Sequence, residues 1–76
     1  MPKAYVLINI ESGSEDKVLS DIKKTPGIQE VYVSYGVYDL LVKVAADSVD
    51  EMREIVTRRL RTIDDVRSTL TLTIVE

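Results

Sequence analysis

The sequence predicts an α+β domain whose elements follow the order β-α-β-β-α-β. Four runs rich in apolar and β-branched residues have the composition of strands, and two segments between them carry apolar residues at helical spacing. A Gly-X pair joins the two middle runs, which is typical of an antiparallel hairpin. At 76 residues, the chain is expected to form one domain over residues 1–76.

The first strand and the first helix are predicted from the N-terminal third of the chain. Residues 4–10 form a continuous apolar and β-branched run, which favours a strand. Ser12 and Glu15 have the spacing of a capping box, so we expect a helix to open there and to continue to about Lys24. A Pro-Gly pair then ends it.

The two middle strands are predicted to form a hairpin. The second strand covers residues 28–35 and the third covers residues 38–45. Gly36-Val37 lies between Tyr35 and Tyr38. A Gly-X pair between two β runs predicts a two-residue turn of type II′.

The second helix begins with another capping pattern. Ser48 and Glu51 have the capping-box spacing, and the helix is predicted to continue to about Arg61. Glu54 and Arg58 are four residues apart, which favours an ion pair on the helix surface.

The last strand completes the order. After a turn at residues 63–65, residues 66–75 are predicted to form the strand, and within it leucine or isoleucine alternates with threonine over residues 69–74. Crossovers between strands are right-handed. The β-α-β-β-α-β order therefore predicts a ferredoxin-like sandwich, in which a four-stranded antiparallel sheet carries both helices on one face.

The other face of that sheet has no element in the chain to cover it. Residues 4–10 and 40–44 carry apolar side chains on both faces, whereas a sheet with one wet face alternates apolar and polar residues. Small domains also need a further source of stability, and the absence of Cys and His excludes disulfides and the usual zinc sites. We therefore expect a homo-oligomer built on sheet-on-sheet dimers, a dimeric α/β-barrel-type assembly.

Composition limits the classes of function. Without His or Cys the chain lacks the commonest general base and the best nucleophile, so we expect no enzyme, no metal and no cofactor. A net charge of −3 argues against direct nucleic-acid binding. No apolar run reaches the length of a membrane span, and the N-terminus has no signal-peptide pattern, so a cytoplasmic protein is expected.

One constellation suggests ligand binding: the segment Tyr35, Gly36, Val37, Tyr38 and Asp39. Asp39 follows the predicted turn and precedes an apolar strand, where an unpartnered carboxylate is costly to bury. It could accept hydrogen bonds from turn amides. It could instead receive the ammonium group of a ligand whose carboxylate is held by exposed turn amides, which together would recognise an amino acid.

Four segments, taken in their order along the chain, resemble those of a known family. They are the opening strand at residues 4–8, the Pro-Gly-Ile-Gln-Glu-Val segment at residues 26–31, the Gly-x-Tyr-Asp-Leu element within residues 36–44, and the threonine-rich run at residues 66–75. Together they cover essentially the whole chain. The chain resembles the ligand-binding (RAM) module of the Lrp/AsnC transcriptional regulators.

The resemblance implies dimers that assemble into octamers and bind a free amino acid between subunits, near the hairpin. On that model the ligand contacts are Tyr35, Gly36, Val37, Tyr38 and Asp39, with Ser68, Thr69 and Thr71 as partners on the last strand. Family regulators carry an N-terminal helix-turn-helix, and this sequence starts at the first strand. Its role is therefore expected to be indirect, through co-assembly with a full-length regulator or as an amino-acid sensor or buffer.

Three alternatives share the same order of elements. One is a small dimeric α/β-barrel enzyme with monooxygenase or isomerase chemistry, which would place a polar residue in a cavity between sheet and helices. Another is an ACT-like domain, whose ligand sits near the first strand-to-helix loop. The third is an assembly adaptor that binds no ligand.

Overall fold

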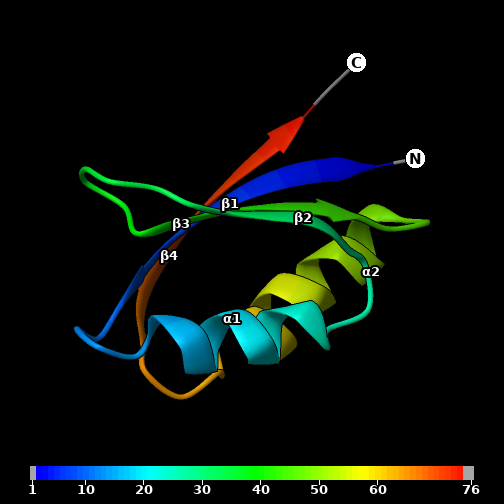
Figure 1. Cartoon of the computed structure of the whole chain (residues 1–76). Coiled ribbons are helices and arrows are strands. Elements are labelled where there is room, and N and C mark those ends of the chain that lie inside the picture. The colour runs from blue at the N-terminus through cyan, green and yellow to red at the C-terminus, as the bar shows by residue number, and fades with distance from the viewer. Residues whose placement is uncertain (1, 75–76) are drawn as a thin grey trace.

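The computed structural model describes residues 2–74 and confirms the ferredoxin-like order (Figure 1). The elements are β1 (Lys3–Ile10), α1 (Glu15–Lys23), β2 (Ile28–Val33), β3 (Leu40–Ala45), α2 (Val49–Glu54), the π-helix η1 (Ile55–Leu60) and β4 (Val66–Ile74). The predicted last residue of the final strand, Val75, lies outside the described residues.

The sheet has the strand order β2-β3-β1-β4, and every neighbouring pair is antiparallel. Both helices lie on one face of it, as Figure 1 shows. No helix in residues 2–74 is long and apolar enough to cross a bilayer.

The core lies between the sheet and the helices. Alternate residues of the two central strands are fully buried there, as are Val18 and Ile22 of α1 and Leu60 of η1. Burying one such side chain contributes roughly 1.5–3 kcal/mol. The central strand residues concerned are Ala4, Val6, Ile8, Leu40, Val42 and Val44.

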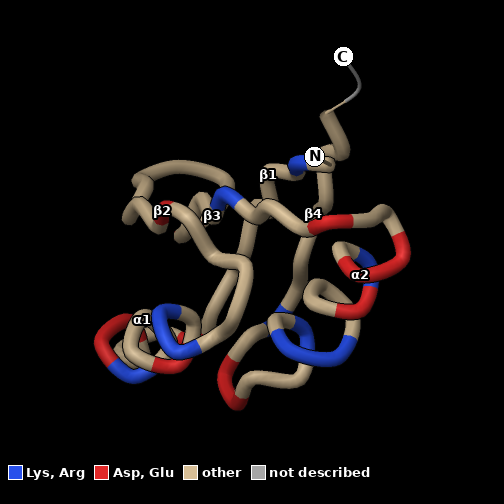
Figure 2. Tube along the Cα trace, turned by 90° about the vertical axis from the view of Figure 1, so that its right-hand side faces the viewer, with Lys and Arg blue, Asp and Glu red and all other residues tan. Residues whose placement is uncertain are grey.

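The opposite face of the sheet is open and carries mostly apolar side chains, with Lys3 and Lys43 also on it. Leu7 pairs with Leu41 of β3 and with Leu70 of β4, and Tyr5 pairs with Leu72. Residues directly opposite each other share a face. Leu70 and Leu72 are 44% and 50% exposed, and Figure 2 shows that most charged residues lie on the helices and turns. The predicted two-faced apolar pattern of the central strands is confirmed.

Tyr32 of β2 lies on the same open face, opposite Leu41. A hydrogen bond with the Glu30 side chain, together with the negative charge of Glu30, raises the pKa of the Tyr32 hydroxyl.

The predicted capping box at the first helix is wrong. The N-cap is Ser14, no side chain caps the helix, and Ser12 lies outside it. The Ser14 hydroxyl donates to the backbone carbonyl of Glu11. The preceding loop is fixed by backbone bonds instead, since the Glu11 amide donates to the Asp65 carbonyl at 2.8 Å.

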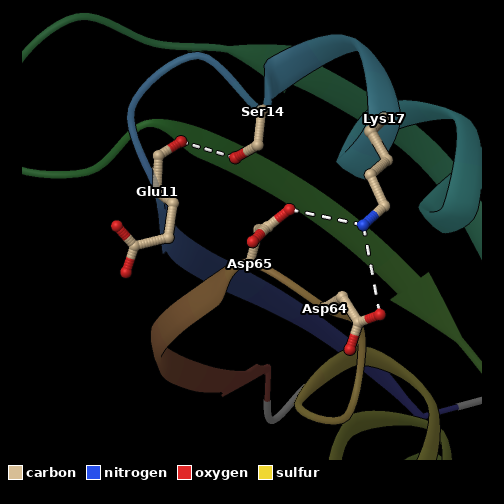
Figure 3. A network of polar contacts seen from close by, with 5 residues as sticks. All are labelled: Glu11, Ser14, Lys17, Asp64 and Asp65. Carbon is tan, nitrogen blue, oxygen red and sulfur yellow. Dashed lines mark hydrogen bonds and ion pairs between the residues drawn. The ribbon is translucent and has the colours of Figure 1, made fainter.

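Figure 3 shows the polar contacts that join α1 to the turn before β4. The Lys17 ammonium lies 3.4 Å from Asp65 and 4.0 Å from Asp64. Lys17 and Asp64 are more than half exposed, so these ion pairs contribute little to stability.

The second capping prediction is confirmed in its main feature. The Ser48 side chain accepts a hydrogen bond from the Glu51 amide at 3.1 Å, and Arg58 lies 3.7 Å from Glu54. The helical segment ends near Arg61 as predicted. Its second half is nevertheless a π-helix, in which the Arg61 amide donates to the Val56 carbonyl at 3.0 Å.

The predicted two-residue turn of type II′ is wrong, although β2 and β3 pair in the register that such a turn implies. Val33 pairs with Leu40, which is the register that a turn centred on Gly36-Val37 gives. Strand pairing stops early, however, and residues 34–39 form a loop closed by a bond of 2.8 Å from the Ser34 amide to the Asp39 carbonyl. The Asp39 amide donates to Ile8 of β1 at 3.0 Å, which draws Asp39 into the neighbouring strand pair.

Candidate functional site

Asp39 is held at the start of β3 by the central strand. One carboxylate oxygen, Oδ2, accepts a hydrogen bond of 3.0 Å from the Ile10 amide. The Ile10 amide is available because the pairing of β1 with β3 ends at Ile8 and Leu40. On the other edge of β1 the pairing with β4 shifts, since Asn9 pairs with Ser68 and Ile10 pairs with Val66. The partner of the carboxylate is thus an amide of β1 rather than the turn amides that the sequence suggested.

A polar depression of about 390 Å³ surrounds this carboxylate. Three of its lining residues were predicted from the sequence: Val37, Asp39 and Ser68. The other three were not predicted: Asn9, Ile10 and Arg67. The depression, which we call the Asp39 pocket, therefore brings a carboxylate and a guanidinium together beside a hydroxyl.

Arg67 is the residue that the register shift inserts into β4. Its Nε lies 3.6 Å from the Glu11 carboxylate, and both side chains are more than half exposed. An exposed pair of this kind is weak, so the guanidinium is free to turn towards a ligand. Arg67 is the one charged residue in the run at residues 66–74, which is the signal in the sequence that could have singled it out.

The remaining loop residues differ in exposure. Tyr35 is 97% exposed and Val37 is 84% exposed, while Tyr38 is half-buried. Tyr35, Gly36 and Tyr38 do not line the Asp39 pocket. Gly36 has a φ of 148°, which side-chain-bearing residues rarely adopt, so this glycine is needed for the path of the loop.

Thr69 and Thr71 lie on the other side of the sheet from Leu70. They pair with Ile8 and Val6, whose side chains are buried under the helices. Both threonines line a second groove, beneath α2 and η1, and neither lines the Asp39 pocket. One chain therefore does not bring all the predicted ligand contacts together.

The family follows from comparison with known proteins. The family model of the Lrp/AsnC ligand binding domain matches residues 3–76. The chain belongs to this family. An uncharacterized HTH-type transcriptional regulator of Pyrococcus furiosus is 38% identical over 72 residues, a match that covers 91% of this chain and 48% of the regulator. The Lrp/AsnC domain described here thus spans about half the length of this curated relative.

Solved structures agree with the family assignment. The crystal structure of FFRP-DM1 is 31% identical with a TM-score of 0.94, and the match covers 99% of this chain and 100% of that one. The regulator NMB0573 of Neisseria meningitidis, solved as a complex with L-Met, has the same fold at 13% identity, with a TM-score of 0.89. That match covers 99% of this Lrp/AsnC domain and 50% of the regulator.

Proposed function

We propose that this Lrp/AsnC domain binds a free amino acid and acts as an oligomeric regulatory module in transcription, without contacting DNA itself. The observation that carries the proposal is the pair of opposite charges in the Asp39 pocket. A free amino acid at neutral pH carries an ammonium and a carboxylate on the same α-carbon, so its recognition needs a negative and a positive group close together.

Each charge has a defined role in the proposal. The Oδ2 atom of Asp39 is fixed by the Ile10 amide, so the carboxylate is preorganised and its Oδ1 receives the ammonium group. Arg67 leaves Glu11 and binds the ligand carboxylate, because a guanidinium matches a carboxylate with two parallel hydrogen bonds. The Ser68 hydroxyl lies beside both.

Neighbouring subunits complete the site in this proposal. Tyr35 does not line the pocket and Val37 lines it while remaining 84% exposed, so a second copy packed against residues 34–39 would enclose the ligand. Thr69 and Thr71 reach the same ligand only if they come from such a neighbour. The L-Met complex of the Neisseria regulator supports a ligand of this class on this fold.

The open sheet face supports the oligomer. A second copy packed sheet against sheet would cover Leu7, Leu70 and Leu72, which form part of an apolar surface on one subunit. Such dimers are proposed to assemble further, to the octamer that the family resemblance implies. Co-assembly with a full-length Lrp/AsnC regulator would connect ligand binding to DNA.

A catalytic role has less support. The buried side chains of residues 2–74 are apolar apart from Thr25, whose hydroxyl donates to the Asp21 carbonyl at 3.1 Å. A dimeric α/β-barrel enzyme would place a reactive polar group between sheet and helices, and Thr25 is engaged at the end of a helix.

Calorimetric titration with each of the twenty amino acids tests the proposal, with Asp39→Asn and Arg67→Gln as variants. We expect micromolar binding of one or a few amino acids, weakened about tenfold or more in both variants. Asp47→Asn and Arg59→Gln make the same charge changes outside the pocket and should bind as the original protein does. If no amino acid gives heat with the assembled protein, an adaptor is favoured. If Asp39→Asn binds normally, the site assignment is wrong.

A further inference from the structure

The side of β4 that faces the helices is polar, although the sandwich would bury apolar residues there. Thr69, Thr71 and Thr73 point to this side, and the leucines between them point to the open face. The result is a groove of about 360 Å³ beneath α2 and η1, which we call the threonine–arginine groove. It is lined by Met52, Arg53, Val56, Thr57, Arg61, Thr69, Thr71 and Thr73.

The strand hydroxyls in this groove are available to a ligand. Among the described residues, none of the three strand threonines makes a side-chain hydrogen bond. Thr57 differs, because its hydroxyl donates to the Arg53 carbonyl at 2.7 Å. Thr69 and Thr73 are four residues apart on a strand, so the hydroxyl row is roughly 13 Å long.

Two guanidinium groups line the same groove without a carboxylate partner. Within residues 2–74, neither Arg53 nor Arg61 lies within 4.0 Å of an acidic group, whereas Arg58 pairs with Glu54 at 3.7 Å. The lining contains no acidic residue. A cation at a helix end can serve the helix dipole, but Arg53 lies where α2 continues directly into η1.

We propose that the threonine–arginine groove binds a small organic dianion, either a dicarboxylate or a phosphate ester. Two guanidiniums supply two positive charges, and the threonine hydroxyls donate hydrogen bonds to anionic oxygens. Met52 and Val56 line the groove beside them and contact the carbon part of the ligand.

This site differs from the Asp39 pocket in its charge. A zwitterionic amino acid would find no carboxylate here for its ammonium group, whereas the Asp39 pocket offers both charges. Within one subunit the two sites share no lining residue, and Thr69 and Thr71 enter the amino-acid site only as contributions from a neighbouring subunit. A dimer formed through the open sheet face would leave the groove accessible on the helix side of the sheet.

Succinate and inorganic phosphate are the probes, each titrated into the whole protein by calorimetry, with succinamide as the uncharged control. We expect at least one dianion to bind, and succinamide to give no heat. Arg53→Gln and Arg61→Gln should each weaken binding about tenfold or more. Thr71→Val, which keeps the shape and removes a hydroxyl, should also weaken it. Arg59→Gln is the matched control, because Arg59 lies on the same helix but outside the groove lining.

The outcomes separate the ligand classes. Binding of phosphate alone points to a phosphate ester, and binding of succinate alone points to a dicarboxylate. The proposal is overturned if neither dianion binds below about 10 mM, or if binding is unchanged in both arginine variants. Asp39→Asn should leave dianion binding intact, so the amino-acid proposal and this one can fail separately.

Discussion

Gly27 lies where the loop after α1 passes closest to the second helical segment. Its φ is +90°, and a Cβ atom placed on it would lie 2.6 Å from Ile55 Cδ1 and 3.0 Å from the Ala45 carbonyl oxygen. The position therefore excludes a side chain for two separate reasons: the backbone conformation and the space.

Gly27→Ala is predicted to lower the free energy of unfolding by about 2–4 kcal/mol, because left-handed strain and overpacking add. Gly13→Ala is the matched control. Its φ is +85°, but nothing lies within 4 Å of the added Cβ, so about 1–2 kcal/mol is expected. Urea denaturation of both variants measures the difference. Equal losses would show that the contact with Ile55 relaxes without cost.

Asp39 has a structural role beside its proposed ligand role. Asp39→Ala leaves the Ile10 amide without its acceptor and is predicted to lower the free energy of unfolding by about 1–3 kcal/mol. Asp39→Asn keeps an acceptor oxygen and should cost less. Chemical denaturation of the two variants checks this order, and the reverse order would mean that the Ile10 contact contributes nothing.

The sequence singled out Asp39 correctly as a residue with a special environment, but it did not reveal Arg67 or Asn9. Asn9 reaches the pocket because β1 pairs with β3, and Arg67 reaches it at the point where β4 carries one extra residue opposite Asn9 and Ile10. A bulge of this kind depends on how two distant strands align, and periodicity within one strand does not show it.

The two helices begin in different ways, and this gives a test at the scale of the element. Ser48→Ala removes the side-chain cap on the Glu51 amide and is predicted to cost about 1 kcal/mol. Ser12→Ala removes a serine with the same sequence spacing to a glutamate but no cap, and it should cost less than about 0.5 kcal/mol. Thermal or urea unfolding of both variants distinguishes them. Equal effects would contradict the observed caps.

Elements were predictable where local residues determine them. The order of elements, the hairpin register and the Ser48 cap follow from turn residues and apolar spacing. The length of the hairpin loop does not, because Asp39 bonds to β1 instead of closing a tight turn. The π-helix also escaped prediction, since residues 55–60 have an ordinary helical pattern and the i to i−5 bonding appears only in the structure.

At the scale of the whole molecule, β4 turns its polar side chains towards the helices and its apolar side chains towards the open face, the opposite of what a sandwich core requires. Alternation separated leucines from threonines in the sequence, but only the pairing with β1 shows which set faces the helices. The leucines face outward, onto the open sheet face. An exposed apolar surface of this kind marks an interaction site, which is why the proposed dimer is built on this face.

On the proposed dimer, Leu72→Lys is predicted to shift the protein from a dimer or larger assembly towards the monomer, because it places a further charge on the face that the partner would cover. Thr73→Lys puts the same charge on the next residue, which faces the helices, and should leave assembly intact. Light scattering coupled to gel filtration measures both masses. A monomeric original protein, or a Leu72→Lys variant of unchanged mass, would contradict sheet-on-sheet dimerisation.

The central claim is that an amino acid binds between the charges of the Asp39 pocket. The most direct test is a crystal structure of the protein grown with the amino acid that binds most tightly in the titration. We predict density for the ligand with its ammonium at about hydrogen-bonding distance from Asp39 and its carboxylate on Arg67, enclosed by residues 34–39 and a neighbouring subunit. Ligand density elsewhere, with the Asp39 pocket filled only by water, would contradict the account.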